Sequence, residues 1–263
     1  YEIGVRLVGS EMCIRDSVST QANTTNWAGV KAWENLGAER VVLARELSIK
    51  EIAEIASHTQ VELEVFVHGA MCISYSGRCW LSSYLTGRDG NRGACAQVCR
   101  WAFNLTEKNR PGEVYDVAED DRGTYVMNSR DLCLLPCLPR LMQAGVASFK
   151  IEGRMKSAHY AASVVSVYRK AIDACWADPA AYQVQPEWQE ELEKVSHRPY
   201  TTGFALEKPA ASAQEYSSSS YFQTHDFVGL VRGWEKGRVL IEQRNHVKAV
   251  SYTHLTLPTI LLV

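Results

Sequence analysis

The sequence predicts an α/β fold, namely the C-terminal half of a TIM-type (β/α) barrel with a cysteine-bearing insertion, followed by a small β domain. Two observations support this prediction. Short apolar runs alternate with amphipathic helical stretches from Val18 to residue 177, and alternating βα units indicate a parallel sheet, for which the eight-unit barrel is the commonest large architecture. Beyond Pro186 two runs with strand periodicity appear, which indicate a separate small β domain.

The elements before the insertion carry local signals. A helix is expected to stop at Gly37, since glycine readily adopts the left-handed conformation that ends helices. The next helix opens with Ser48 and with Glu51 three residues later, the pattern of a capping box. In chain order the expected elements are a strand end at residues 19–23, a helix at 26–36, a strand at 40–44, the helix that Ser48 opens, and a strand at 61–67 that ends at His68-Gly69.

The elements after the insertion complete the series. They are a short strand at residues 125–128, a helix at 139–144, a strand at 146–151, and helices at 157–177 and 187–194. A serine-rich linker at 217–220 precedes runs at 227–234 and 238–242, and Lys236-Gly237 between these runs favours a turn. The parallel strands make up about half a barrel. A half-barrel exposes sheet edges, so we expect the native protein to contain further strands before Val18.

The domain organisation follows from these changes in pattern. Residues 18–185 are expected to form the partial barrel, with the cysteine-rich insertion at 70–133, and residues 186–249 to form a linker helix and a truncated small β domain. Residues 9–17 (GSEMCIRDS) and 250–263 (VSYTHLTLPTILLV) lack continuity with their neighbours and resemble translated sequencing-adapter read-through, which marks 1–17 and 250–263 as artefactual ends. We therefore expect both ends, with Cys13 and His254, to carry no functional information. Ordinary frayed termini are the alternative.

The composition indicates a soluble globular protein. Hydrophobic residues make up 46% and charged residues 22%, and a formal charge of −2 gives no global attraction to nucleic acid or to a membrane. The absence of a long apolar run and of a basic-then-apolar start argues against a membrane span and against secretion. The expected location is cytoplasmic, where eight cysteines are more often metal ligands, catalytic thiols or buried side chains than disulfides.

Polar residues follow the predicted strands at the end where a barrel gathers its active site. This rim collects the βα loops into one cavity. Each residue also has a structural alternative: the strand-end charges could form surface pairs or a bridge, and the histidine could be half-buried and hydrogen-bonded. The candidate catalytic residues are Gln21, Asn23, Arg45, Glu46, His68, Lys150, Glu152 and Arg154.

Five cysteines cluster in the insertion. Six residues separate Cys72 from Cys79, fifteen separate Cys79 from Cys95, and three separate Cys95 from Cys99. A further 33 residues separate Cys99 from Cys133. Four thiolates from such a loop can hold a [4Fe–4S] cluster, because its soft, sulfide-bridged iron prefers thiolate. Structural zinc, whose sites use cysteine pairs about two to four residues apart, and unligated packing cysteines are the alternatives.

Arginines and aromatic residues are interleaved with these cysteines. Arginine contacts phosphates and aromatic rings stack on unpaired bases, so this composition suits single-stranded or loop RNA. A solvated loop with anchoring aromatics is the structural alternative. The residues are Arg78, Trp80, Tyr84, Arg88, Arg92, Arg100 and Trp101.

Several segments form long motifs: residues 64–72 (EVFVHGAMC), 76–79 (SGRC), 93–101 (GACAQVCRW), 128–133 (NSRDLC) and 149–156 (FKIEGRMK). Together they resemble the signature of the collagenase-like peptidase family, peptidase family U32. The resemblance covers about residues 18–242. Residues 79–101 and the STQAN segment at 19–23 are most similar to the branch of this family that hydroxylates tRNA to 5-hydroxyuridine.

The resemblance implies a TIM-type barrel with a small C-terminal β domain, and an iron–sulfur enzyme. Family members serve oxygen-independent hydroxylation of the tRNA wobble uridine, of a ribosomal RNA cytidine or of a ubiquinone precursor. The tRNA branch draws on prephenate as a co-substrate, and some members use a paralogous partner subunit. By position, the implied cluster ligands are Cys72, Cys79, Cys95 and Cys133, with Cys99 as the rival fourth ligand.

Three functions are compatible with these observations. The favoured one is iron–sulfur-dependent hydroxylation of the tRNA wobble uridine, with tRNA or another RNA as partner and no membrane. A collagenase-like peptidase is the alternative, although the sequence contains neither HExxH nor GxSxG. A zinc-stapled RNA-binding module without catalysis is the third.

Overall fold

Strand β3 (Glu62–Ala70) lies at the centre of the main sheet, and its residues are buried from Leu63 to Gly69. The computed structural model describes residues 16–101, 104–106, 114–116, 129–208, 221–235 and 237–245. In this part of the chain, β3 pairs in parallel with β2 (Arg40–Val42) and β7 (Val146–Ile151), and β2 pairs in parallel with β1 (Ser17–Val18). The predicted α/β class with a parallel sheet is therefore confirmed.

Helices connect these parallel strands, as the alternating pattern predicts. Helix α2 (Trp27–Asn35) lies between β1 and β2, α3 (Ile49–Ser57) lies between β2 and β3, and α5 (Leu138–Gln143) precedes β7. The predicted capping box is present at α3. The Ser48 hydroxyl accepts a hydrogen bond from the Glu51 N–H at 3.3 Å, and the Glu51 carboxylate accepts one from the Ser48 N–H at 2.7 Å.

Two short strands depart from the predicted alternation. Strand β6 (Asp131–Cys133) runs antiparallel to the end of β3, where His68 pairs with Cys133. Strand β8 (Tyr200–Thr201) pairs in parallel with β6, so a piece of the expected linker region joins the main sheet. Strands this short have too few residues to show a period, and their pairing depends on segments far apart in the sequence.

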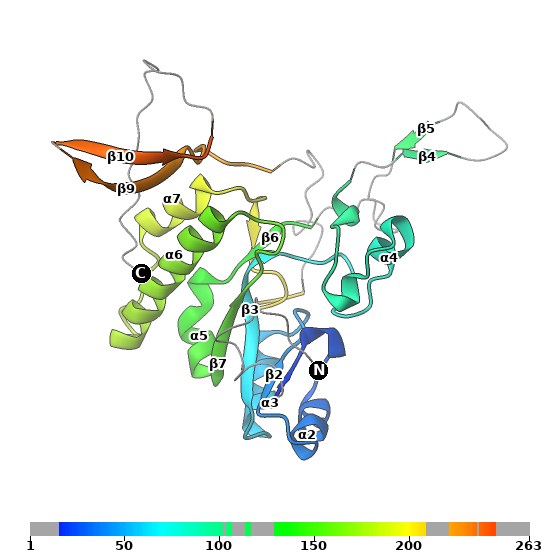
Figure 1. Cartoon of the computed structure of the whole chain (residues 1–263). Helices are drawn as coiled ribbons and strands as arrows, with labels where there is room; N and C mark the ends of the chain where they lie inside the picture. The colour runs from blue at the N-terminus through cyan, green and yellow to red at the C-terminus, as the bar shows by residue number, and fades with distance from the viewer. Residues whose placement is uncertain are drawn as a thin grey trace.

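Helices α6 (Ala158–Ala177) and α7 (Pro186–Lys194) gather with α5 on one side of the sheet (Figure 1). The N-terminus of α6 is capped by the Ser157 hydroxyl, which accepts from the Tyr160 N–H. A stripe of α6 residues at helical spacing is buried against the apolar side chains of the sheet: Tyr160, Val164, Val167 and Ala171. This packing holds α6 against the face of the sheet that contains β3 and β7.

The cysteine-bearing insertion leaves the sheet after β3, on the side away from α6 (Figure 1). Its described elements are α4 (Leu81–Thr86), the 3₁₀ helices η3 (Gly90–Arg92) and η4 (Val98–Arg100), and the antiparallel pair β4 (Asn104–Thr106) and β5 (Val114–Asp116). Two further 3₁₀ helices, η2 (Thr20–Ala22) and η5 (Leu135–Cys137), follow β1 and β6. The two runs expected in the C-terminal part form the antiparallel hairpin β9 (Gly229–Glu235) and β10 (Arg238–Gln243).

Some predicted features lie outside the described residues: the strand at 125–128, the linker at 217–220, Cys13 and His254. Ser17, expected to belong to the foreign-looking start, pairs with Arg40 in the main sheet. Among the residues that the structure describes, no helix is both long and apolar enough to cross a membrane.

Candidate functional site

Arg45 lies at the end of β2 and connects several of the predicted site residues. Its guanidinium carbon is 3.8 Å from the centroid of the Phe66 ring, a cation–π contact. Burial lowers the pKa of Arg45, while the negative charges of Glu152, Cys72 and Glu46 act in the opposite direction. The Arg45 cation therefore lies within electrostatic reach of two predicted carboxylates and of the first insertion cysteine.

Glu46 is held by the insertion. The Ser76 N–H and hydroxyl both donate to Oε1 of Glu46, at 3.0 and 3.3 Å, and the Ser76 hydroxyl accepts from the Arg45 N–H at 3.2 Å. The second carboxylate oxygen, Oε2, is buried and has no hydrogen-bond partner in the described part of the chain. Glu46 is thus oriented through one oxygen, and the other is available to a proton or a ligand.

Gln21 and Asn23 lie in the segment after β1 against which the insertion packs. Asn23 has a left-handed backbone conformation (φ 54°), and its Oδ1 is buried without a hydrogen-bond partner among the described residues. A Cβ added to Gly77 would fall 2.1 Å from the backbone oxygen of Gln21, so only glycine permits this close approach. The insertion therefore packs directly on the strand end that carries both predicted residues.

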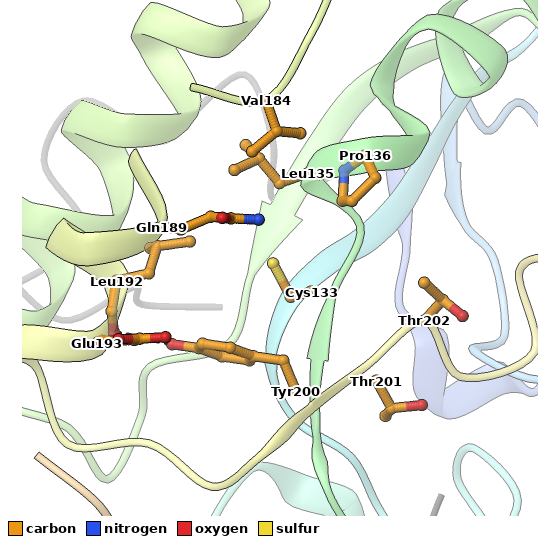
Figure 2. A pocket seen from close by; sticks show the side chains of 10 residues that line it. All are labelled: Cys133, Leu135, Pro136, Val184, Gln189, Leu192, Glu193, Tyr200, Thr201 and Thr202. Atoms are coloured by element: carbon orange, nitrogen blue, oxygen red, sulfur yellow. Dashed lines mark hydrogen bonds between the residues drawn. The ribbon is translucent and has the colours of Figure 1, made fainter. Parts of the chain in front are cut away.

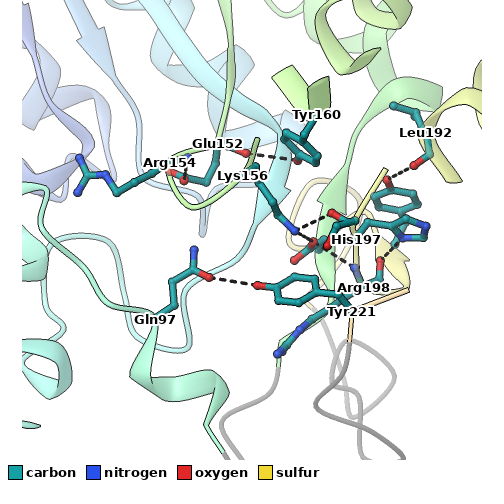
Figure 3. A network of polar contacts seen from close by, with 12 residues as sticks. Gln97, Glu152, Arg154, Lys156, Tyr160, Leu192, His197, Arg198 and Tyr221 are labelled. Carbon is teal, nitrogen blue, oxygen red and sulfur yellow. Dashed lines mark hydrogen bonds and ion pairs between the residues drawn. The ribbon is translucent and has the colours of Figure 1, made fainter. Parts of the chain in front are cut away.

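Glu152 and Arg154 follow β7 and form a local turn rather than an ion pair. The Arg154 N–H donates to Oε1 of Glu152 at 2.8 Å, and the Tyr160 hydroxyl donates to the Glu152 backbone oxygen at 3.3 Å (Figure 3). A Cβ added to Gly93 would lie 2.7 Å from Nη2 of Arg154. The Arg154 side chain therefore contacts the insertion at Gly93, whereas the charge of Glu152 acts on Arg45.

Lys150 has a structural role in this arrangement. Its ammonium donates to Oε1 of Glu64 at 2.8 Å, and the Ser148 hydroxyl donates to Oε2 of the same carboxylate at 2.9 Å. Glu64 is buried, and a buried carboxylate requires such partners.

His68 faces a different environment from the other predicted residues. The register of β3 against β7 shifts between Phe66 and His68, and such a bulge turns the following side chain away from its regular face. The His68 ring packs with Tyr168 at 5.4 Å and Tyr200 at 5.2 Å between centroids. In the described structure, His68 is therefore grouped with tyrosines from α6 and β8 rather than with Arg45 and Glu46.

The protonation state of His68 follows from this burial. Burial lowers its pKa to about 3, so the ring is neutral near pH 7. The Tyr168 hydroxyl donates to the Val67 backbone oxygen at 2.8 Å and lies 3.4 Å from Nδ1 of His68. Because that hydroxyl proton is already used, we assign the ring proton to Nδ1, which leaves Nε2 as a buried acceptor. This geometry supports the structural alternative for His68.

Three of the insertion cysteines lie close enough to influence one another. The pKa of Cys72 is raised to about 11, mainly by burial and also by the negative charges of Cys79 and Cys99, while Arg45 acts in the opposite direction. Cys95 accepts a hydrogen bond at its sulfur from the Gln97 N–H at 3.3 Å. Thiolates that repel one another are stabilised by a bound cationic group, so the donor chemistry fits a metal centre.

Cys133 is set among aromatic and apolar side chains. Burial raises its pKa, and its sulfur lies 3.8 Å from the Tyr168 hydroxyl. Figure 2 shows the sulfur facing a pocket of about 350 Å³. The pocket is lined by Cys133, Leu135, Pro136, Val184, Gln189, Leu192, Glu193, Tyr200, Thr201 and Thr202. The structure thus places Cys99, not Cys133, with Cys72 and Cys79.

No three His, Cys, Asp or Glu side chains in the described part of the chain lie close enough together to ligate a single metal ion. A sulfide-bridged cluster occupies more space than one ion and accepts more widely spaced thiolates.

A buried ionic cluster was not among the predicted site residues. Asp131 and Arg198 are both fully buried, and the backbone N–H of Arg198 donates to Oδ2 of Asp131 at 3.2 Å. The Lys156 ammonium lies 4.0 Å from the same oxygen and 3.8 Å from the centroid of Tyr221 (Figure 3). Buried charges need such partners. The signal in the sequence was the position of Asp131 and Lys156 inside two of the long motifs.

The comparisons with known proteins agree on one family. A family model described as peptidase family U32 matches residues 6–215. The chain is 45% identical over 88% of its length to tRNA hydroxylation protein P1 of Bacillus subtilis, covering 55% of that protein, and 40% identical over 84% to tRNA hydroxylation protein P of Escherichia coli, covering 57%. It is also 31% identical over 78% to a collagenase of Porphyromonas gingivalis, covering 51% of it.

The chain spans about half the length of the curated relatives it matches. No solved structure gives a significant match.

Proposed function

This chain belongs to peptidase family U32, and from this membership we propose that it is part of an enzyme that hydroxylates the wobble uridine of tRNA to 5-hydroxyuridine without molecular oxygen. The observation that supports the proposal most strongly is the 45% identity, over 88% of the chain, to a protein named for tRNA hydroxylation. We further propose that the parallel strands are half of a TIM-type barrel, completed by the part of the protein outside this chain, and that the enzyme is cytoplasmic.

The cofactor we propose is a [4Fe–4S] cluster. Its ligands would be Cys72, Cys79, Cys95 and Cys133, with Cys99 as the rival for the fourth position. When bound, such a cluster supplies one-electron chemistry at iron held by thiolates. The half-buried thiol of Cys72, its neighbours Cys79 and Cys99, and the adjacent Arg45 cation support a centre at this position.

The strand-end residues are proposed to handle the substrates. Any proton released from a substrate at this rim needs a base to take it up. Glu46 is our assignment for that base, because one of its oxygens is fixed by Ser76 and the other has no partner among the described residues. Arg45 would hold a carboxylate of prephenate, the proposed co-substrate, since guanidinium is the best carboxylate partner.

The test uses the full-length protein, purified without oxygen. A brown preparation with stoichiometric iron and sulfide would support the cluster, whereas a colourless protein with zinc and full activity would contradict it. For the substrate, tRNA from a deletion strain is digested and its 5-hydroxyuridine derivatives are quantified by mass spectrometry. Loss of these nucleosides, restored by the intact gene but not by one encoding Glu46→Gln, supports the proposal. Unchanged levels would contradict tRNA as the substrate and would favour ribosomal RNA, a quinone precursor or a peptide instead.

A collagenase-like peptidase is the second candidate, favoured by the identity to the Porphyromonas protein. A serine peptidase needs a hydroxyl, a histidine and a carboxylate in one hydrogen-bonded series. Within the described residues, the serine and threonine hydroxyls bonded to histidine rings are those of Ser57 (to His58) and Thr224 (to His225), and neither ring is hydrogen-bonded to a carboxylate. If the oxygen-free preparation cleaves gelatin, and this cleavage persists when the cysteine ligands are replaced by alanine, the peptidase candidate would be favoured.

A further inference from the structure

Helix α4 in the insertion presents two large aromatic side chains to solvent. Trp80 is 75% exposed and Tyr84 is 86% exposed. The Tyr84 N–H donates to the Trp80 backbone oxygen at 2.9 Å, so the two residues lie one helical turn apart on the same face. Aromatic rings of this size bury large areas in cores and interfaces, and leaving two of them in water forgoes that stabilisation.

The exposure of this pair is imposed by how α4 is anchored. Ser82 lies on the opposite face, about 200° around the helix from both aromatics. Ser82 is buried, and its hydroxyl donates to the Arg88 backbone oxygen at 2.8 Å and accepts from the Ala96 N–H at 3.0 Å. The helix is thus tied to the two segments that follow it, and the aromatic face is held outward.

The charge around this helix differs from that of the whole chain. Residues 75–101 contain four arginines and one aspartate, whereas the complete chain has a formal charge of −2. Arg78, Arg88 and Arg92 are exposed. The single carboxylate, Asp89, lies 3.4 Å from Arg92. An excess of exposed guanidinium groups beside exposed aromatic rings is complementary to a polyanion that also offers flat apolar surfaces.

We propose that Trp80 and Tyr84, with the neighbouring arginines Arg78 and Arg88, form a binding surface for unpaired RNA nucleotides. The two rings would stack on bases and the guanidinium groups would contact phosphates. Double-stranded RNA does not fit, because its bases are already stacked inside the helix. Trp80 directly follows Cys79, so a nucleotide on this surface lies next to the cysteine centre. The choice of a tRNA loop as occupant rests on the proposed function.

The test measures binding of a tRNA anticodon stem–loop to the full-length, cluster-loaded protein by fluorescence anisotropy. Trp80→Ala and Tyr84→Ala are each expected to raise Kd by roughly 5- to 100-fold, the effect of losing one base–aromatic stack. Arg88→Gln is expected to lower the salt dependence of binding by about one phosphate contact. A blunt RNA duplex of equal length should bind weakly and equally to all variants.

Matched controls come from exposed tryptophans elsewhere on the chain. Trp176 on α6 is 79% exposed and Trp234 on β9 is 61% exposed, and neither belongs to the insertion. Trp176→Ala and Trp234→Ala should change Kd by less than about twofold. Iron content is measured for every variant, so that damage to the cysteine centre is separated from loss of RNA contact.

The outcomes distinguish this inference from the proposed function. Unchanged stem–loop affinity in both Trp80→Ala and Tyr84→Ala, or losses that follow iron content in both, would overturn the binding surface while tRNA hydroxylation could still stand. A protein that binds the stem–loop through these residues but forms no 5-hydroxyuridine would support the surface and contradict the function. If the variants keep RNA affinity but lose self-association in sedimentation, the aromatic pair docks protein and the inference is wrong.

Discussion

Tyr221 donates a hydrogen bond of 3.1 Å from its hydroxyl to Oε1 of Gln97, joining segments 124 residues apart in the chain. Gln97 has a left-handed backbone conformation (φ 54°), and its N–H donates to the sulfur of Cys95. On the other side, the Tyr221 ring packs against the Lys156 ammonium (Figure 3). A single tyrosine therefore connects the insertion to the buried ionic cluster around Asp131.

Replacing Tyr221 by phenylalanine tests this connection. The change keeps the ring over Lys156 and removes the hydroxyl, so we expect a loss of about 0.5–1.5 kcal/mol in unfolding free energy. Urea denaturation of the full-length protein measures it. Tyr75→Phe is the matched control, because Tyr75 is exposed and its hydroxyl makes no hydrogen bond within the described residues. Equal effects of the two changes would show that the Tyr221 bond contributes nothing.

Gly69 is predicted to be irreplaceable by alanine. Its φ is +106°, and an added Cβ would fall 2.2 Å from the backbone oxygen of Glu152. Gly37 has a comparable φ of +89° but nothing within 4 Å of the added Cβ. Gly37→Ala should therefore cost about 1 kcal/mol from backbone strain. Gly69→Ala should cost about 1–3 kcal/mol more from overpacking, measured by thermal or urea unfolding. Similar values for both variants would contradict the close approach.

His68 should make stability depend on pH on the acid side. Its pKa is about 3 in the folded protein and about 6.5 when unfolded, so the unfolded state binds the proton first. Its contribution is complete above about pH 6.5 and is lost progressively as the pH falls toward 3, by up to about 1.4 kcal/mol per pH unit. Urea unfolding between pH 7 and pH 5 should show a flatter slope for His68→Gln than for the unchanged protein. Parallel slopes would mean that the ring titrates normally.

The fourth cysteine ligand is open to direct test. Following the family pattern, we expect Cys133→Ala to lose iron and Cys99→Ala to retain it, each measured on anaerobically purified full-length protein. Cys175→Ala, a buried cysteine in α6, controls for loss of packing alone. The described geometry supplies the competing result, since Cys99 rather than Cys133 raises the pKa of Cys72. Iron loss in Cys99→Ala alone would therefore assign Cys99 as ligand.

The alternating strands and helices could be predicted because their signals are local. Ser48 and Glu51 mark a helix start by contacts within one turn, and the apolar spacing along α6 reports a buried face. Strand β7 has the predicted bounds, residues 146–151, because a β-branched and apolar run of this length is a strand signal by itself. The cysteine motifs likewise depend on spacing along one loop.

The grouping of the site residues could not be predicted in the same way. Arg45 and Glu46 meet Cys72 and Ser76 as expected for one rim, but His68 does not join them. A shift of register in β3 separates His68 from Phe66, and the period of the sequence contains no record of such a shift. Asp131 and Arg198 could not be found by looking for polar residues at strand ends, because their burial depends on the pairing of β6 with β8.

The sequence by itself determined the α/β class, the alternation of strands and helices along the chain, the motifs of peptidase family U32 and the set of cysteines available to a metal centre. Only the tertiary structure decided that His68 faces the tyrosines of α6, that Glu46 is oriented by Ser76, and that Trp80 and Tyr84 point into solvent. The reason is physical: capping, periodicity and spacing act within a few residues, whereas burial and pairing are set by segments tens of residues apart that meet only in the folded chain.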